Sequence, residues 1–360
     1  MQNGRVIFKK ISEAGFDAVV FFDQISQRYL TGFLSSDSVV LVTEQETALI
    51  TDSRYFEAAF NAKSSGQLFE DVNPYLYKNR LFDALSEHIK AKNILSLAFD
   101  NSLLTVAQAE RLKKSFPTLN ICGITDICKE KRKIKSKREI ENIKAAQNIT
   151  DAAFSYILSY IKPDITEIEI AAKIEYFCRR NGAESMAFDT IAVSGKNSSL
   201  PHGLPSVNRL KMDSFFTMDF GAKYNGYCSD MTRTVVVGKA TDEMKHIYQT
   251  VLTAQKLALD SIKSGVTGRY VDKVARYYIN SAGYEGCFGH STGHSLGLEI
   301  HEQPRFSTSS SEIISAGTVM TVEPGIYLPG KFGVRIEDLV LVTENGFENF
   351  TKSSKELIEI

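Results

Sequence analysis

An internal repeat constrains the fold of this 360-residue chain more than any other feature of its sequence. Residues 161–166 (IKPDIT) align with residues 262–267 (IKSGVT), and the same offset pairs Gly182 with Gly283. Thr166 and Glu169 fit a capping box, and glycine is favoured just after a helix, so the first copy predicts a helix ending near Gly182. A longer amphipathic helix is expected before each copy, at 137–161 and 242–263. The repeat therefore predicts one duplicated domain with two helices in each half.

Residues 1–130 alternate short apolar runs with helical patterns, which predicts a smaller α/β domain. Strands are expected at 18–22, 39–42, 47–51 and 94–99, and helices from Asp52 and over 81–89. The basic run at 129–138, KEKRKIKSKR, interrupts this pattern. Because a charge run inside a neutral protein is typically solvated, we interpret 131–137 as a linker between a domain at 1–130 and a second domain at 138–360.

The composition excludes several classes of protein. Apolar residues make up 43% and charged residues 24% of the chain, and the formal net charge is -1, as in an ordinary globular protein. A balanced charge gives no electrostatic footprint for nucleic acid or an anionic membrane, and no apolar run approaches the roughly 20 residues of a membrane span. The five cysteines form no Cys-x-x-Cys pair, which is typical of reduced thiols. We therefore expect a cytoplasmic protein that binds neither nucleic acid nor a membrane.

Half of the six histidines lie in one glycine-rich stretch, residues 289–302, with the sequence GHSTGHSLGLEIHE. Its regularly spaced glycines argue against a regular helix and for a backbone that bends tightly beside a ligand. A single histidine would more simply be a packing or surface residue, but three so close together indicate a shared site. The chain has no His-Glu-x-x-His helix, which excludes a zincin site, so further metal ligands must come from elsewhere.

Carboxylates on predicted strands are the candidates for those ligands. Strand alternation in FFTMDFG places Asp219 away from the apolar face, and a turn around Asn225-Gly226 brings Asp230 close to it. Glu323 and Glu337 occupy similar positions on two later strands. Each acid alone could be a surface residue at a strand end, but facing carboxylates repel each other and a cation would remove the repulsion. Together with His294, four carboxylates would balance two divalent ions of the manganese type.

These residues resemble a known family, the creatinase/aminopeptidase P/prolidase metallopeptidases with the "pita-bread" fold, in their Xaa-Pro peptidase branch. The matching stretches are MDFG at 218–221, SDMTRT at 229–234, GHSLGLEIHE at 293–302, VEPG at 322–325 and RIED at 335–338. The resemblance covers nearly the whole chain. It implies an α+β fold: a pita-bread catalytic domain with pseudo-twofold duplication, preceded by a smaller α/β creatinase-like domain.

The resemblance also implies a metal site with two divalent ions. Asp230 and Glu337 would bridge the ions, Asp219 would bind one, and His294 with Glu323 would bind the other. A hydroxide between the ions would be the nucleophile, because divalent metals lower the pKa of bound water. Manganese is favoured by the hard oxygen ligands, with cobalt or zinc as alternatives.

Further roles follow from the same resemblance. Glu323 would also act as general base, and His202 and His301 would stabilise the tetrahedral intermediate and the substrate amide. His290 and Arg335 would line the substrate site. Arg335, like Thr232, would also orient a ligand carboxylate.

The substrate implied by the resemblance is a short peptide or dipeptide, cut at the Xaa-Pro bond nearest its amino end by a homodimeric enzyme. Whether the enzyme is a dipeptidase or acts on longer peptides stays open. A methionine aminopeptidase-like activity is the main alternative, opposed by the additional domain at 1–130. A creatinase-like activity without metal and a non-catalytic peptide-binding module are opposed by the intact set of five ligands.

Overall fold

The computed structural model describes residues 3–360. The chain divides into two compact units, Met1–Lys131 and Arg132–Ile360. This boundary lies close to the expected linker at 131–137. None of the helices within residues 3–360 is long and apolar enough to cross a membrane.

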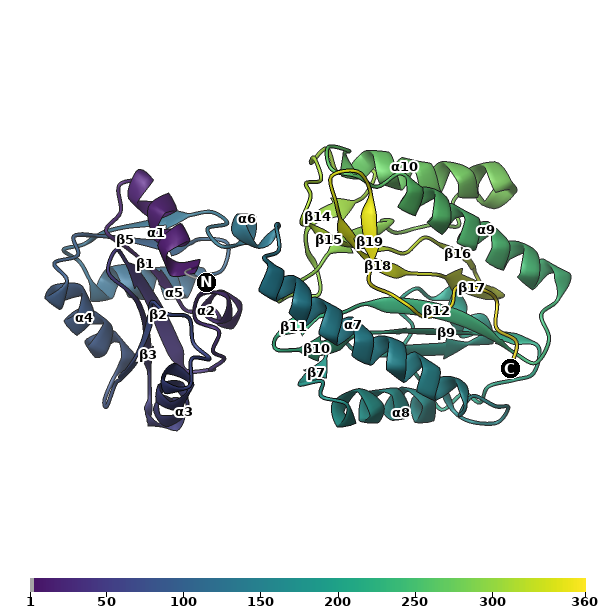
Figure 1. Ribbon diagram of the computed structural model, residues 1–360, viewed down its shortest axis with the longest axis horizontal. Helices are drawn as coiled ribbons and strands as arrows, with labels where there is room; N and C mark the ends of the chain where they lie inside the picture. The colour runs from purple at the N-terminus through teal and green to yellow at the C-terminus, as the bar shows by residue number, and fades with distance from the viewer. Residues whose placement is uncertain (1–2) are drawn as a thin grey trace. The chain divides into compact units, whose positions relative to one another are not determined.

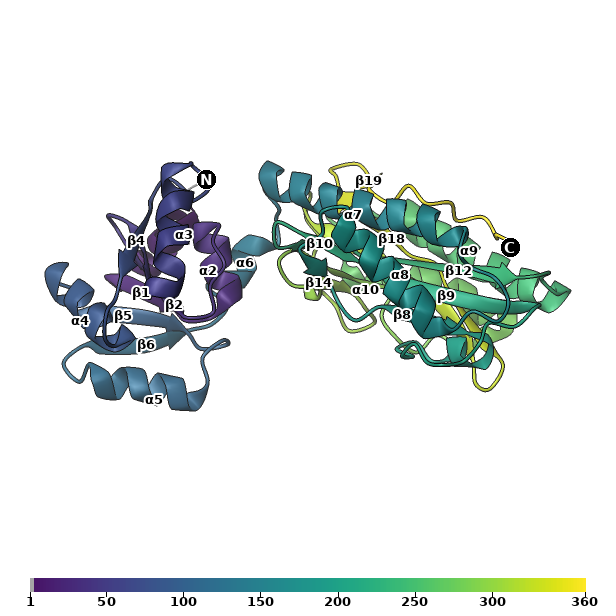
Figure 2. The ribbon, with the colours of Figure 1, turned by 90° about the horizontal axis from the view of Figure 1, so that it is seen from below.

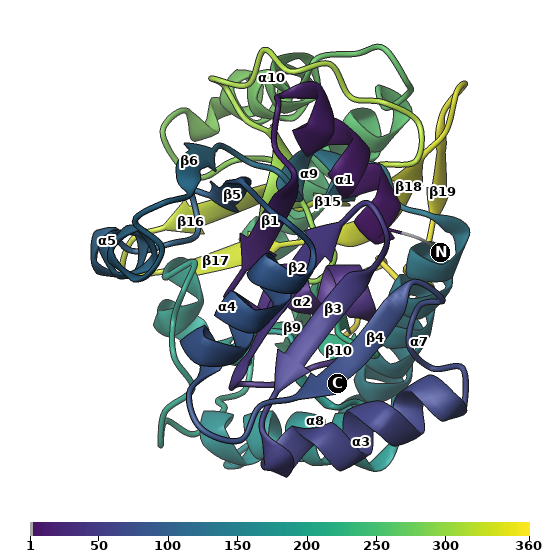
Figure 3. The ribbon, with the colours of Figure 1, turned by 90° about the vertical axis from the view of Figure 1, so that its left-hand side faces the viewer.

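The first unit is an α/β domain, as its sequence predicts. Its six strands form one sheet in the order β4-β3-β2-β1-β5-β6, with β1 parallel to β5 and antiparallel to β2 (Figure 3). The elements are α1 Asn3–Glu13, β1 Ala18–Phe21, α2 Gln24–Thr31, β2 Ser38–Thr43, β3 Thr47–Thr51, α3 Ser53–Ser64, β4 Val72–Leu76, α4 Leu81–Ala91, β5 Ser96–Asp100, α5 Val106–Ser115, β6 Asn120–Ile124 and α6 Lys129–Arg132.

Helices cover both faces of this sheet. Leu85 and Ile89 of α4 and Leu112 of α5 share a core cluster with Val20 and Leu41 of the central strands. The helices α2 and α3 lie on the other side of the sheet from α5 (Figure 2). The central strands β1, β2 and β3 are therefore buried along their whole length, which explains why they are continuous apolar runs without alternation.

The second unit contains the duplicated helices that the repeat predicts: α7 Lys137–Leu158, α8 Glu167–Arg180, α9 Asp242–Asp260 and α10 Gly268–Ile279. Thr166 caps α8 with a complete capping box, and Thr267 caps α10. Gly182 and Gly283 both have positive φ, 101° and 92°, after the paired helices. The predicted cap and end of the first copy are confirmed, and each half begins with a longer helix followed by a shorter one with a threonine cap.

Strands of the second unit lie between these helices, and Figure 1 shows α8 and α10 on opposite sides of them. The sheets have the orders β11-β10-β7, β12-β9-β8, β14-β13-β15-β18-β19 and β16-β17. The strands are β7 Ser185–Met186, β8 Ile191–Ser194, β9 Ser214–Phe220, β10 Ala222–Tyr224, β11 Tyr227–Cys228, β12 Met231–Val237, β13 Gly293–Ser295, β14 Glu302–Phe306, β15 Val319–Val322, β16 Gly325–Leu328, β17 Phe332–Arg335, β18 Asp338–Val342 and β19 Phe347–Asn349. A short 3₁₀ helix, Gly195–Ser199, follows β8, and a π-helical segment, Asn280–Tyr284, follows α10.

Each half of the second unit has its own core. Apolar residues of α7 and α8 pack with β9 and β12, and those of α9 and α10 pack with β15 to β18. The predicted α+β class with an internal duplication is thus the observed architecture.

The expectation of a solvated basic run is wrong for two of its residues. Arg132 and Lys135 are 4% and 5% exposed. Arg132 contacts Glu302 and lies 2.8 Å from Glu299 Oε2, while Lys135 Nζ donates to Ser295 Oγ at 3.0 Å and lies 3.2 Å from Glu302 Oε2. Burial lowers the pKa of Lys135, and the Glu302 carboxylate opposes that shift. These cations are buried because they neutralise a buried carboxylate beside the glycine-rich stretch.

Replacing Glu302 should therefore destabilise the second unit. Glu302→Ala leaves two buried cations without their main counter-charge, which should lower the free energy of unfolding by about 3 kcal/mol. Glu312 pairs with Lys133 of the same basic run but is half-buried, so Glu312→Ala should cost less than about 1 kcal/mol. Urea denaturation followed by circular dichroism measures both values. Equal losses in the two variants would contradict a structural role for the buried cluster.

Candidate active site

The first two predicted ligands meet on the strand pair β9–β12. Asp219 of β9 lies directly opposite Thr232 of β12, and Asp230 immediately precedes β12. The turn between β10 and β11 uses Asn225 and Gly226, both with positive φ, which suits a tight hairpin. The chain therefore folds back so that the two carboxylates face each other, as the sequence predicts.

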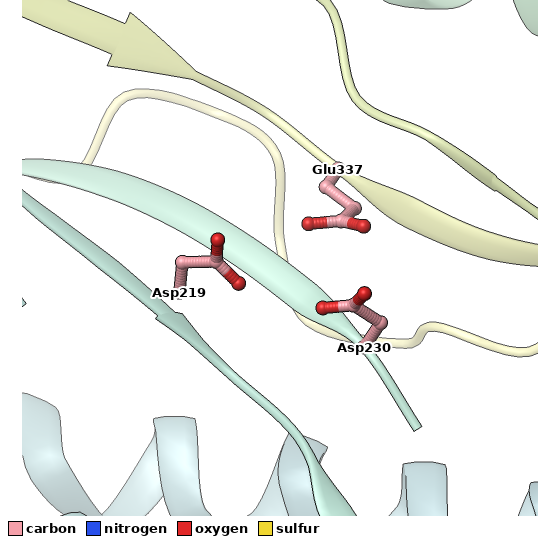
Figure 4. Close-up of side chains that lie close together, drawn as sticks. All are labelled: Asp219, Asp230 and Glu337. Atoms are coloured by element: carbon pink, nitrogen blue, oxygen red, sulfur yellow. The ribbon is translucent and has the colours of Figure 1, made fainter. Parts of the chain in front are cut away.

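Glu337 completes a cluster of three carboxylates. It lies between β17 and β18, and its ligand atom and those of Asp219 and Asp230 all lie within 4.8 Å of one another. Figure 4 shows the three carboxyl groups pointing toward a common centre. Glu323 follows β15, and its Oε1 accepts a hydrogen bond from Thr321 Oγ1 at 3.1 Å. Residues 323–324 connect β15 to β16.

These carboxylates line a cavity of about 440 Å³ within the second unit. All the site residues predicted from the sequence lie in its wall: His202, Asp219, Asp230, His290, His294, His301, Glu323, Arg335 and Glu337. The remaining wall has an apolar part with Phe188, Ile191, Pro201, Leu204 and Ile300, and three polar residues, Asp189, Ser291 and Arg305. The cavity therefore combines a strongly acidic floor with an apolar side, which suits a small substrate with one apolar group.

His294 reaches the acidic cluster from β13. Its Nε2 lies 3.4 Å from Glu323 Oε1 and 3.6 Å from Asp230 Oδ2, and its Nδ1 lies 3.1 Å from the carbonyl oxygen of Ser295. Burial, with a smaller contribution from His301, lowers the pKa of His294 to about 3. The imidazole is therefore neutral near pH 7, the form that binds metal ions, and the contact with the carbonyl leaves Nε2 as the free ligand atom.

The acidic cluster is electrostatically incomplete without cations. Burial, followed by the charge of a neighbouring carboxylate, raises the pKa values of Asp230 and Glu337 well above their usual range. Burial also raises the pKa of Glu323 to about 7. Among the described residues, Asp219 Oδ1 and Glu337 Oε1 are buried without a hydrogen-bond partner. Unpaired buried oxygens are costly, so the donor set fits divalent cations with oxygen ligands.

A buried arginine holds the carboxylates in place. Arg335 is 3% exposed and donates hydrogen bonds to Asp219 Oδ2 at 2.7 Å and Thr232 Oγ1 at 3.0 Å. Thr232 in turn donates to Glu337 Oε2 at 2.7 Å. Arg335 also donates to Tyr327 Oη at 2.6 Å, and this oxygen lies 2.8 Å from His290 Nε2. Tyr327 could not be predicted from the sequence, because its partners His290 and Arg335 come from other parts of the chain.

An ion pair on α10, which the sequence analysis did not predict, holds the segment 288–292. Asp272 and Arg276 form a two-bond ion pair on α10, and Arg276 also donates to the carbonyl oxygens of Phe288 and His290 at 2.6 and 2.7 Å. Asp272, fully buried, accepts hydrogen bonds from the backbone N–H and the hydroxyl of Thr292. The Asp-x-x-x-Arg spacing was visible in the sequence, but such spacing is common on exposed helix faces.

Comparison with known proteins identifies the family. The model of metallopeptidase family M24 matches residues 141–344, and that of the creatinase/prolidase N-terminal domain matches residues 7–134. The chain belongs to metallopeptidase family M24, and divalent metal ions are implied by that membership.

Relatives match over nearly the full length of the chain. The chain is 37% identical to the Xaa-Pro dipeptidase of Pyrococcus furiosus over 98% of both chains. It is also 40% identical to an uncharacterized peptidase, YqhT, of Bacillus subtilis over 96% of both. Among solved structures, the Xaa-Pro dipeptidase from Bacillus anthracis has a TM-score of 0.93 at 40% identity and 99% coverage of both chains. The X-Pro aminopeptidase from Thermotoga maritima has a TM-score of 0.91 at 38% identity and covers 97% of this chain and all of its own.

The raised pKa values make the stability of the metal-free protein depend on pH. Folded Asp230, Glu323 and Glu337 bind protons more tightly than the unfolded chain does, so their contribution to stability is lost as pH rises through the folded pKa. The buried histidines have lowered pKa values and act in the opposite direction, but only below the unfolded value of about 6.5. The carboxylates therefore dominate above neutral pH.

We expect the free energy of unfolding of chelator-treated protein to fall as pH rises above about 6.5, because the histidines no longer oppose the loss of protons from the buried carboxylates. Manganese should remove this fall, because the cations offset the repulsion between carboxylates. Calorimetric melting with and without manganese measures the effect, and Glu337→Gln should reduce the slope by removing one charge. Metal-free stability that rises over this range would contradict the electrostatic description of the site.

The ion pair between Asp272 and Arg276 on α10 predicts an effect on catalysis. Arg276→Lys keeps the charge but loses the forked contact with Asp272 and both carbonyl oxygens, so the segment carrying His290 should loosen. We expect kcat/KM to fall about tenfold while metal content is unchanged. Arg269 is the matched control on the same helix, because it is exposed and makes one long contact with the Ser309 carbonyl oxygen. Kinetics of Arg276→Lys and Arg269→Lys that agree within error would contradict the prediction.

Proposed function

We propose that this protein is a metal-dependent exopeptidase that hydrolyses the Xaa-Pro bond at the amino end of short peptides or dipeptides. The observation that carries the proposal is the cavity floor, where four carboxylates and a neutral histidine converge and buried oxygens lack partners. Full-length similarity to proteins named Xaa-Pro dipeptidase and X-Pro aminopeptidase supports the choice of substrate. In this proposal the chemistry belongs to residues 138–360, which follow an N-terminal domain at 1–130 and a linker at 131–137.

We propose two divalent ions, with Asp230 and Glu337 shared between them. Asp219 would hold one ion, and His294 and Glu323 the other. When bound, divalent ions would lower the pKa of a bound water and polarise the carbonyl group of the scissile bond. Manganese fits a donor set of four carboxylates and one imidazole, with cobalt or zinc as alternatives.

Glu323 is the residue proposed to move the proton. Its carboxylate lies in the cavity wall, with Oε1 3.4 Å from His294 Nε2, and so offers a proton acceptor at the acidic floor. It would accept a proton from the attacking water and then release it to the proline nitrogen as the C–N bond breaks. Thr321 orients the carboxylate through its hydroxyl group.

The histidines and Arg335 are proposed to act on the substrate and on the ligands. His301 packs against His294 with ring centroids 4.5 Å apart, and together with His202 it would donate hydrogen bonds to the developing oxyanion and the substrate amide. His290 would line the substrate site in the orientation that Tyr327 fixes. Arg335 lies in the cavity wall, where it would contact the substrate, and its hydrogen bond orients the Asp219 carboxylate.

The Xaa-Pro bond suits a dedicated cavity. Its amide has no N–H and its φ angle is restricted, so an enzyme that binds an extended strand loses a hydrogen bond at proline. A site that grips the carbonyl oxygen and surrounds the ring with apolar side chains does not need that N–H. The apolar wall near Phe188, Ile191 and Leu204 offers such surroundings. A homodimeric state and a cytoplasmic location stay predictions.

The proposal is tested by hydrolysis of Ala-Pro and Ala-Pro-Ala by metal-stripped protein before and after addition of manganese. We expect no cleavage without metal and full recovery with it, since the ions supply the nucleophile. Asp230→Ala should stay inactive with manganese present, because it removes a shared ligand. The peptide that is cut faster decides between a dipeptidase and an aminopeptidase on longer peptides.

Two outcomes would overturn the proposal. Equal turnover of Ala-Pro-Ala and Ala-Ala-Ala would exclude proline specificity and favour a methionine aminopeptidase-like activity. Tight binding of two ions without hydrolysis of any of these peptides would mean that the site is intact and the substrate class is wrong.

A further inference from the structure

A fully buried glutamate lies outside the proposed metal site and has no role in the mechanism above. Glu167 is the first residue of α8 and is 0% exposed. Its Oε1 accepts hydrogen bonds from the backbone N–H and the hydroxyl of Ser194, both at 2.8 Å. Its Oε2 accepts from the backbone N–H of Ser206 at 3.1 Å and from the Ser206 hydroxyl at 2.7 Å. One carboxylate therefore joins two points of the chain that are twelve residues apart in sequence.

The segment between those two points reaches the cavity. Residues 195–205 leave β8 through the short 3₁₀ helix Gly195–Ser199, and Pro201, His202 and Leu204 lie in the cavity wall. Leu204 is 71% exposed, so packing does little to fix the outer part of the segment. The position of His202 thus depends on how the base of the segment is held.

Further hydrogen bonds hold the base of the segment. The backbone N–H of Glu167 donates to the Asn208 carbonyl oxygen at 3.0 Å, and that of Ile168 donates to the Ser206 carbonyl oxygen at 3.1 Å. On the other side, Ser198 Oγ accepts from the Gly333 N–H at 2.9 Å on β17, the strand that carries Arg335. The Glu167 carboxylate is the group that ties both ends of the segment to one helix.

A buried carboxylate is a costly way to close a loop. Its partners are backbone amides and hydroxyl groups, and removing an ionised group from water is favourable only when such partners satisfy its oxygens. Its place at the N-terminus of α8 also favours a negative charge. Such a network fixes one geometry more narrowly than apolar packing would.

The second half of the domain uses a similar arrangement. Fully buried Asp272 on α10 holds Thr292, and the segment around it carries His290. In both halves, the helix capped by the repeated threonine supplies a buried carboxylate to a histidine-bearing segment.

We propose that Glu167 is a positioning residue, which fixes the base of segment 194–206 and thereby sets the place of His202 in the cavity. The proposal rests on the peptidase function proposed above. Glu167 touches neither substrate nor metal ligands, so its effect should reach the reaction only through His202 and its neighbours in the segment.

The test is a double-mutant cycle with Ala-Pro as substrate and manganese present. Glu167→Gln keeps the size of the side chain but presents an NH₂ group to one pair of donors, so one end of the segment should be released. We expect kcat to fall roughly 10- to 100-fold, with KM changed less than about threefold and metal affinity unchanged. In a His202→Ala background, Glu167→Gln should have little further effect on kcat, because the group it positions is gone.

Glu169→Gln is the matched control. Glu169 lies two residues further along α8, is exposed, and serves the capping box with Thr166, a role that glutamine also fills. This variant should keep wild-type kinetics. Hydrogen exchange of residues 195–205 provides a readout independent of activity, and it should rise in Glu167→Gln but not in Glu169→Gln.

Ser206→Ala is the milder variant if Glu167→Gln fails to fold. It removes the hydroxyl that donates to Glu167 and accepts from the Asn208 N–H, but it keeps the backbone contact of Ser206 with Glu167. It should therefore give a smaller loss of kcat with the same dependence on His202. Losses of kcat that multiply independently in the double variant, or unchanged exchange of 195–205, would overturn the proposal. Inactive wild-type protein with manganese bound would instead overturn the peptidase function, and the exchange measurement would still decide whether Glu167 holds the segment.

Discussion

Repulsion between carboxylates buried in one cavity is the constraint on which the rest of the catalytic unit depends. Asp219, Asp230, Glu323 and Glu337 are brought together by strand pairings whose energy comes from the two apolar cores, so folding imposes an arrangement that the charges themselves oppose. Arg335 and Thr232 satisfy some of the oxygens and leave others unpaired. The metal-free fold therefore carries unneutralised negative charge in its cavity. Bound cations would neutralise this charge, and the same carboxylates would hold the ions needed for catalysis.

The two halves of the duplicated domain use their helices in a similar way. In each half both helices pack into the core, and the shorter helix also turns a buried acidic side chain toward a segment at the cavity, Glu167 in the first half and Asp272 in the second. The two acids do not occupy equivalent repeat positions, since Glu167 aligns with Gly268. The halves thus share an arrangement of helix and segment rather than conserved contacts, which is what independent adjustment of two loops after duplication would produce.

Local patterns predicted most of the elements and the acidic cluster, because they depend on spacing along the chain. The threonine caps, the glycines with positive φ and the alternation around Asp219 are examples, since neighbouring residues decide each of them. The residues whose roles were not predicted have partners that are distant in the sequence. The partner of Arg132 lies 170 residues away, and a charge run looks solvated unless that partner is known. Tyr327 and Glu167 were missed for the same reason, because their roles arise from tertiary contacts alone.

The burial of Arg132 and Lys135 determines which residues the catalytic unit needs at its amino-terminal end. A chain that starts at residue 138 would keep every proposed ligand but would leave the buried Glu302 carboxylate without Arg132 and Lys135. That carboxylate follows His301 directly, so the defect would fall beside the active site. A gene fusion or an evolutionary rearrangement that joins this catalytic unit to another domain must therefore include Arg132 and Lys135. The boundary of the catalytic unit therefore lies directly before Arg132, inside the basic run.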